Sequence, residues 1–221
     1  MTLRPTTPDE RRAFIQAQTA IAAPPLTPEI RLHLATEITP IWQATEATLA
    51  ANNLPPPYWA FAWPGGQALT RLLLDQRHWI AGKRVLDFAA GSGLSAIGAA
   101  IAGAERAIAN EIDDFAAAAV ALNAALNGAR VEVLMQDLIG RNDGWDVVLA
   151  GDVCYERPMA ARVIPWLRDL AGRGVTVLMG DPGRAYLPDQ GLVELASYDV
   201  PTSKELEDRE LRRTRVLRLM P

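Results

Sequence analysis

Cysteine, excess basic charge and long apolar runs are the features that this sequence has little of. Cys154 is the only cysteine among 221 residues, which excludes an internal disulfide and a cysteine-rich zinc site. The 22 basic residues are outnumbered by 26 acidic ones, so the broad basic surface of a duplex-binding protein is missing. No stretch reaches the roughly 18 apolar residues of a membrane span, and residues 1–10 lack the apolar core of a signal peptide. We therefore expect a cytoplasmic protein.

The residues that are present can build one large core. Hydrophobic residues make up 49% of the chain, and a chain of this length buries roughly 70% of its unfolded surface in a single domain. Largely apolar segments predict strands at residues 85–88, 106–110, 130–135, 145–150 and 175–179, which alternate with helical patterns, and the fourth segment suits a parallel sheet covered on both faces. Residues 192–200 and 213–220 are expected to form a closing antiparallel pair. The sequence therefore predicts an α/β fold with a doubly wound, mostly parallel, seven-stranded sheet.

The first 53 residues are predicted to form a helical extension or cover in front of a domain that spans residues 54–221. A first helix is expected to begin at Pro8. A second is expected after Thr27, which precedes a proline in the manner of an N-cap. Its predicted apolar face has three- and four-residue spacing and comprises Ile30, Leu34, Ile38, Ile41 and Trp42. Such a face either packs on the core or covers a substrate site.

Residues 85–94 connect an apolar strand to an Ala-rich helix through a turn of small residues. Gly91 and Gly93 leave room for a ligand beside the backbone, and Asp87 places a carboxylate near the strand's carboxyl end. The glycines alone fit both NAD and S-adenosylmethionine. Asp87 favours S-adenosylmethionine, because a carboxylate there would repel a pyrophosphate but could accept hydrogen bonds from a cationic amino-acid ligand.

Two further carboxylates follow the next strands. Glu111, with Ile112 beside it, ends the second parallel strand, where it could hold both ribose hydroxyls of a nucleoside. Asp137 ends the third strand and could pair with the exocyclic amine of adenine. A solvated loop charge is the alternative interpretation of Glu111.

An aromatic segment at residues 54–66 contains Tyr58, Trp59, Phe61 and Trp63 and is followed by two glycines. Aromatic faces suit both an adenine ring and a cationic group through stacking and cation–π attraction. The segment therefore forms either a wall of the site around Trp63 or a plug that closes the end of the sheet.

These segments together resemble the class I S-adenosylmethionine-dependent methyltransferases. More closely, residues 63–66, the Asp152-x-x-Tyr155 motif after the fourth strand and residues 180–184 are similar to the seven-β-strand protein-lysine methyltransferases, and within them to the electron transfer flavoprotein β-subunit lysine methyltransferase family. Ala89 departs from the general pattern, because it replaces the first glycine of the loop and leaves less clearance near the cofactor.

The resemblance implies that S-adenosylmethionine is the cofactor, that the electron transfer flavoprotein β-subunit is the protein substrate, and that neither metal nor nucleic acid takes part. Asp152 would hold the incoming lysine ammonium, Tyr155 would bound the channel, and Gly151 would lie on the cofactor side. Methyl transfer is one in-line displacement, so orientation is the main task of the enzyme. A small-molecule, nicotinamide-like N-methyltransferase, a ribosomal-protein methyltransferase, an NAD-dependent oxidoreductase and a non-catalytic binding module are the alternatives.

Overall fold

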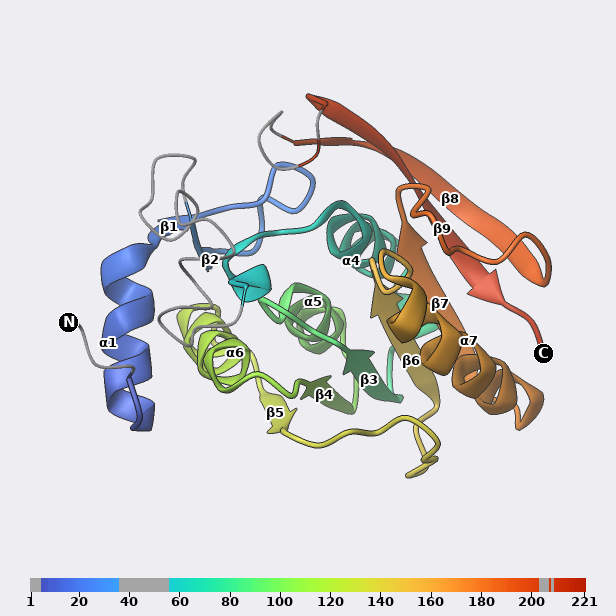
Figure 1. Ribbon diagram of the computed structural model, residues 1–221, viewed down its shortest axis with the longest axis horizontal. Helices are drawn as coiled ribbons and strands as arrows, with labels where there is room; N and C mark the ends of the chain where they lie inside the picture. The colour runs from blue at the N-terminus through green and yellow to red at the C-terminus, as the bar shows by residue number, and fades with distance from the viewer. Residues whose placement is uncertain (1–4, 36–55, 203–206, 208) are drawn as a thin grey trace.

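Seven strands form the main sheet of the computed structural model (Figure 1). The structure describes residues 5–35, 56–202, 207 and 209–221. The strands lie in the order β5-β4-β3-β6-β7-β9-β8. Only β9 runs antiparallel to its neighbours β7 and β8, so the predicted mostly parallel sheet with a closing antiparallel pair is confirmed. The bounds are β3 Arg84–Phe88, β4 Arg106–Asn110, β5 Val131–Leu134, β6 Val147–Gly151, β7 Thr176–Asp181, β8 Leu192–Pro201 and β9 Leu211–Leu219.

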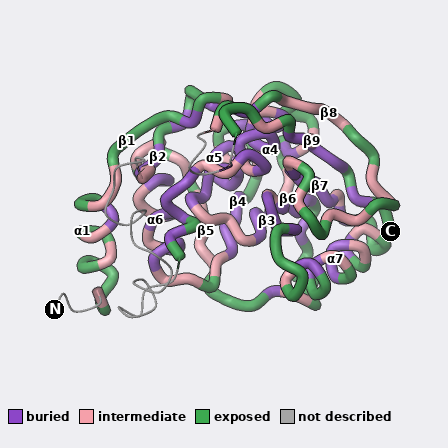
Figure 2. The backbone as a smooth tube through the Cα atoms, turned by 45° about the horizontal axis from the view of Figure 1, so that its top comes forward, coloured by how far each residue is buried: buried purple, intermediate pink, exposed green. Residues whose placement is uncertain are grey.

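Helices cover both faces of this sheet. Neighbouring residues of β3 point to opposite sides, so Val85 packs in the cluster that includes α4 and α5, whereas Leu86 packs with residues of α7. Figure 2 shows the buried residues concentrated in the central strands and on the inner helix faces. In the described part of the chain, the helices that flank the sheet are α4 Pro64–Asp75, α5 Leu94–Ile101, α6 Asp114–Leu126 and α7 Arg157–Gly172, which fits the predicted alternation of strands and helices.

The connection from β5 to β6 contains no helix. Residues 135–146 instead run as turns and extended chain, and Trp166 of α7 holds them by donating from Nε1 to the carbonyl oxygen of Arg141 at 2.8 Å. None of the described helices combines the length and the apolar character needed to cross a membrane.

The N-terminal segment differs from the prediction after its first helix. Helix α1 (Pro8–Gln18) begins as expected, with Thr7 and Glu10 forming a capping box. The predicted second helix is wrong over residues 28–34, because β2 (Leu32–Leu34) pairs there with β1 (Ala20–Ala22). Ile30 and Leu32 are fully buried while Arg31 between them is exposed, as in extended chain, and His33 within β2 is buried as well. Ile38, Ile41 and Trp42, and the predicted boundary at residue 53, lie outside the described residues.

Candidate active site

The glycine loop at residues 89–93 begins where β3 ends and leads into α5. Gly91 and Gly93 have φ angles of 55° and 79°, in the left-handed region that glycine adopts without strain. A side chain on Gly93 would also meet Val120 of α6 at 3.0 Å. Ala89 has a φ of 54° although it is not glycine. In an L-residue this conformation costs roughly 1–2 kcal/mol, so the surrounding structure holds the turn in place.

Asp87 lies beneath this loop. Its side chain is only 3% exposed, and Oδ2 accepts a hydrogen bond from the backbone N–H of Ala96 at 2.9 Å. Burial raises the pKa of Asp87 to about 7, and the hydrogen bond from Ala96 opposes this shift. Asp87 therefore fastens the first turn of α5 to β3.

Glu111 stands directly beside the glycine loop. Its Oε1 accepts from the backbone N–H of Gly91 at 2.6 Å, and its Oε2 accepts from the N–H of Ile112 at 3.2 Å. Burial raises the pKa of the Glu111 carboxyl above its usual range, and these hydrogen bonds counteract the shift. Ile112 itself is 77% exposed.

Asp137 follows β5 and lies at the surface. Its Oδ2 accepts from Arg162 of α7 at 2.7 Å and its Oδ1 from the N–H of Ile139 at 3.1 Å. The Arg162 partner holds the pKa of this carboxyl below its usual range. Asn110, which the sequence analysis did not single out, orders the same edge by donating from Nδ2 to the carbonyl oxygens of Leu134 and Gln136.

A cavity of about 690 Å³ opens at the carboxyl ends of β3, β4, β5 and β6. In an open α/β sheet, this edge is where ligands bind. The structure brings together here all of the predicted site residues except Asp87 and Gly93, which support the loop from behind. The predicted site residues among those that line the cavity are Trp63, Ala89, Gly91, Glu111, Ile112, Asp137, Gly151, Asp152 and Tyr155.

The aromatic segment lines the cavity and also packs into the core. Tyr58 and Trp63 line the cavity, with ring centroids 6.0 Å apart, and Tyr58 lies 5.7 Å from Tyr155. Trp59 is 2% exposed and stacks on Phe115 of α6 with an interplanar angle of 12°. The rings on this side can therefore enclose a flat or cationic ligand, while Trp59 joins the wall to the core.

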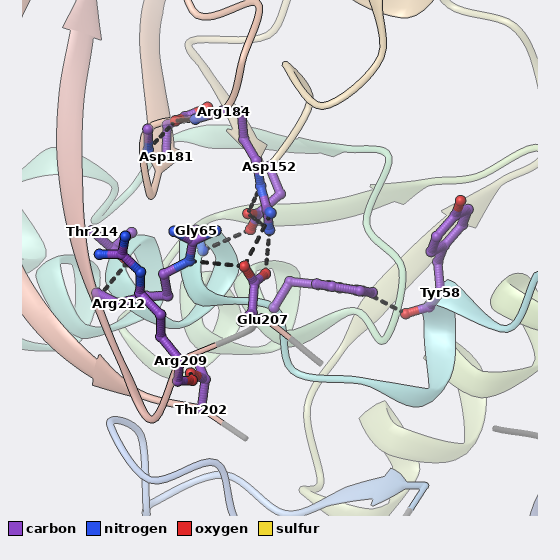
Figure 3. Close-up of polar contacts among 12 residues, drawn as sticks. Tyr58, Gly65, Asp152, Asp181, Arg184, Thr202, Glu207, Arg209, Arg212 and Thr214 are labelled. Atoms are coloured by element: carbon purple, nitrogen blue, oxygen red, sulfur yellow. Dashed lines mark hydrogen bonds and ion pairs between the residues drawn. The ribbon is translucent and has the colours of Figure 1, made fainter. Parts of the chain in front are cut away.

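Asp152 lies directly after β6, the neighbour of β3 in the sheet, and it is the second non-glycine residue with a positive φ among those described, at 56°. Its Oδ2 accepts from the backbone N–H of Gly65 at 2.6 Å, in the first turn of α4. Its Oδ1 accepts from Nε and Nη2 of Arg184 at 3.0 and 2.7 Å (Figure 3). Burial raises the pKa of Asp152 to about 6, and the charge of Arg184 opposes this rise.

Arg184 extends the network to the β8–β9 hairpin. Its guanidinium also donates to Glu207, whose carboxylate accepts in turn from Nε of Arg212 at 3.0 Å (Figure 3). The same guanidinium lies 5.8 Å from the ring centroid of Trp63. In the sequence, Arg184 stands out only as part of its loop and Glu207 not at all, because no local pattern connects residues that lie 23 positions apart.

Tyr155 occupies the outer edge of the cavity, where it is 38% exposed. Burial of the phenol group and the neighbouring Tyr58 raise its pKa to about 12, so the hydroxyl group is neutral at physiological pH. This part of the cavity lining thus presents two phenol rings, an indole and a carboxylate that is ion-paired with arginine.

Comparisons with known proteins agree with this geometry. A family model described as ribosomal protein L11 methyltransferase (PrmA) matches residues 67–153. The magnesium protoporphyrin IX methyltransferase (ChlM) of Synechocystis PCC 6803, solved with bound SAM, superposes with a TM-score of 0.52 at 17% identity, covering 71% of this chain and 78% of that one. At this identity the likeness shows the fold alone, which is that of a class I methyltransferase.

The sequence relatives extend over most of the chain. The electron transfer flavoprotein beta subunit lysine methyltransferase of Xenopus laevis is 39% identical over 204 residues, which cover 89% of this chain and 82% of that protein. The protein of the same name in Homo sapiens is 40% identical over 179 residues, covering 79% and 67%. The matched length therefore reaches well beyond the residues that the PrmA model covers.

Proposed function

The chain belongs to the electron transfer flavoprotein β-subunit lysine methyltransferase family, and from that premise we propose that it methylates a lysine side chain of an electron transfer flavoprotein β-subunit. It is an S-adenosylmethionine-dependent methyltransferase of class I fold. The observation that supports the proposal most is the position of two different sets of groups on one cavity. The glycine loop and Glu111 line this cavity, where they could hold the cofactor, and Tyr58, Trp63, Tyr155 and Asp152 also line it, where they could hold the acceptor.

The cofactor side fits a nucleoside that carries an amino acid. Glu111 presents a carboxylate held rigidly by two backbone N–H groups, which suits the ribose hydroxyls. Asp137 lies where it could accept from the adenine amine, and Gly91 and Ala89 form the floor beside the amino-acid end. When bound, S-adenosylmethionine supplies a methyl group on a sulfonium that an amine nitrogen can attack in line.

The acceptor side must orient an amine and leave it unprotonated. Tyr155, Tyr58 and Trp63 bound the entry, and their faces attract an ammonium group as it arrives. Asp152 is the carboxylate at this entry, and Arg184 keeps it in a fixed orientation. We propose that Asp152 positions the lysine nitrogen, while the chemistry itself requires no covalent intermediate with the protein.

The alternatives account for fewer observations. A ribosomal-protein methyltransferase is represented by the PrmA match, which is confined to residues 67–153 and so covers chiefly the cofactor half of the domain. A nicotinamide-like acceptor would also fit an aromatic wall, but the relatives over most of the chain are named for a protein lysine. The cytoplasmic location and the absence of a nucleic-acid substrate stay predictions.

The test is methyl transfer by the full chain to the recombinant flavoprotein β-subunit of the same organism. With radiolabelled S-adenosylmethionine, we expect label on that subunit, mapped by mass spectrometry to lysine. Substituting the mapped lysine with arginine is the control and should abolish the label. Label on nicotinamide-like amines with none on the subunit would refute the proposed acceptor.

A further inference from the structure

Residues 5–35 contact the cofactor half of the domain. Phe14 of α1 packs edge to face on Phe115 at the start of α6, with ring centroids 5.4 Å apart, and Arg11 forms an ion pair with Asp114. The N–H of Ala35 donates to the carbonyl oxygen of Ala60 at 2.8 Å, in the turn that carries Trp59. Figure 1 shows α1, β1 and β2 beside α6, on the side of the sheet away from α7. The segment therefore supports the aromatic wall and α6 from outside.

Asn123 of α6 and Asn127, the C-cap residue of that helix, hold the backbone of β2 and of the residue before it. Asn127 accepts from the N–H of Arg31 at 2.9 Å and donates to the carbonyl oxygen of Arg31 at 2.6 Å. Asn123 accepts from the N–H of His33 at 2.8 Å. The two asparagine side chains thus form hydrogen bonds with the extended backbone of residues 31–33, as a neighbouring strand would.

Asn123 has a second contact that Asn127 lacks. Its Nδ2 donates to the carbonyl oxygen of Ser92, in the middle of the glycine loop, at 2.8 Å. Asn123 is fully buried, so both hydrogen bonds are shielded from water. One amide group therefore connects the N-terminal strand with the loop that faces the cofactor.

The glycine loop is consequently fixed from two sides. Glu111 accepts from the N–H of Gly91 on the cavity side, and Asn123 donates to the next carbonyl oxygen, that of Ser92, on the far side. A loop of small residues has many accessible conformations, and ordering it only when the ligand binds would cost affinity. Holding it in place in advance removes part of that cost.

We propose that Asn123 is a positioning residue for the cofactor, and that residues 5–35 form an outer support of the cofactor site. The inference rests on the proposed function only in taking the cavity beside Gly91 as the S-adenosylmethionine site. It assigns the N-terminal segment a role different from a cover over the acceptor. Removing the side-chain amide of Asn123 should weaken cofactor binding, and the rate of methyl transfer at saturating cofactor should stay largely unchanged.

The experiment compares Asn123→Ala with Asn127→Ala in the full chain. Both variants release the N-terminal strand, but only Asn123→Ala leaves the Ser92 carbonyl without its partner. Leaving a buried carbonyl oxygen without its hydrogen-bond donor costs free energy. We therefore expect the Kd for S-adenosylmethionine, measured by calorimetry, to rise about tenfold in Asn123→Ala and to change less than about twofold in Asn127→Ala. Asn123→Ser, whose hydroxyl is too short to replace the amide, serves in its place if the alanine variant fails to fold.

The kcat at saturating cofactor separates this role from a merely structural one. We expect kcat in Asn123→Ala to stay within about twofold of the parent, since the loop is ordered once cofactor binds. An equal rise of Kd in both variants, or an unchanged Kd with a lower kcat, would overturn the proposal. Calorimetry needs no acceptor. If the parent enzyme did not methylate the flavoprotein subunit, that result would count against the proposed function, and the comparison of Kd values would still test the role of Asn123.

Discussion

Gly65→Ala should damage this fold far more than a Gly→Ala change in a helix normally does. Gly65 lies in the first turn of α4, which crosses the end of β7 at Gly180 without room for a side chain. A Cβ atom on Gly65 would lie 2.2 Å from the carbonyl oxygen of Gly180 and 2.4 Å from Oδ2 of Asp152. The first neighbour is backbone and the second is fixed by Arg184.

The size of the effect follows from these distances. Ordinary contact begins at 3.4 Å, so α4 would have to withdraw by about 1 Å, a change of the overpacking kind that costs about 1–3 kcal/mol. The same shift stretches the hydrogen bond from Gly65 N–H to Asp152, and a bond to a charged group is worth about 1.5–3 kcal/mol. The gain from replacing a helical glycine is only about 0.5–1 kcal/mol. The net loss of unfolding free energy should be about 2–5 kcal/mol.

Gly66→Ala is the matched control, because it lies in the same helical turn and its Cβ would meet nothing nearer than Ser95 Oγ at 3.9 Å. Urea unfolding of both variants should show Gly65→Ala destabilised and Gly66→Ala at least as stable as the parent. Methyl transfer should fall in Gly65→Ala alone, since Asp152 moves with α4. A Gly65→Ala protein that is as stable and as active as Gly66→Ala would refute the close packing of α4 on β7.

Three further variants test individual carboxylates. Glu111→Gln should weaken S-adenosylmethionine binding about ten- to a hundredfold by calorimetry, because a charged acceptor is lost, and an unchanged Kd would remove Glu111 from the site. Asp152→Asn should lower single-turnover methyl transfer about a hundredfold with less than about a threefold change in cofactor Kd; a lower melting temperature that accounts for the defect would leave Asp152 a structural role. The pKa of Asp87 is raised from 3.8 to about 7, so its contribution to stability is full below pH 3.8 and is lost as pH rises through 7. Asp87→Asn stays neutral and should therefore gain up to roughly 4 kcal/mol over the parent at pH 8 and little at pH 4 in urea unfolding, whereas a gain that does not depend on pH would contradict the raised pKa.

The parallel sheet was predictable from the sequence because its signals are local. Apolar runs such as residues 147–150 are buried on both sides, and the glycine loop follows its strand directly. Strand β2 was not predictable in this way. Ile30 and Leu34 are four positions apart, a spacing that fits a helix face and also the even positions of a strand, and only Leu32 between them distinguishes the two.

The parts of the site that the sequence did not reveal are contacts between distant segments. Gly65 appeared beside an aromatic segment, but its close approach to Gly180 depends on how α4 crosses β7. Glu207 and Asn123 are ordinary polar residues in their local sequence, and their partners lie 23 and 31 positions away. Such residues become visible only when the fold places a buried donor or acceptor opposite them.

The two strained residues connect the fold with the site. Ala89 and Asp152 follow β3 and β6, which are neighbours in the sheet, and both adopt the left-handed conformation that L-residues avoid. The chain leaves β3 toward α5 on one face and β6 toward α7 on the other, so a crevice opens between the two strand ends. Each strained turn is fixed by distant backbone, since Ala90 N–H donates to Asn110 and Asp152 N–H to Gly180. The sheet therefore stabilises both turns, and Ala89 and Asp152 both line the cavity.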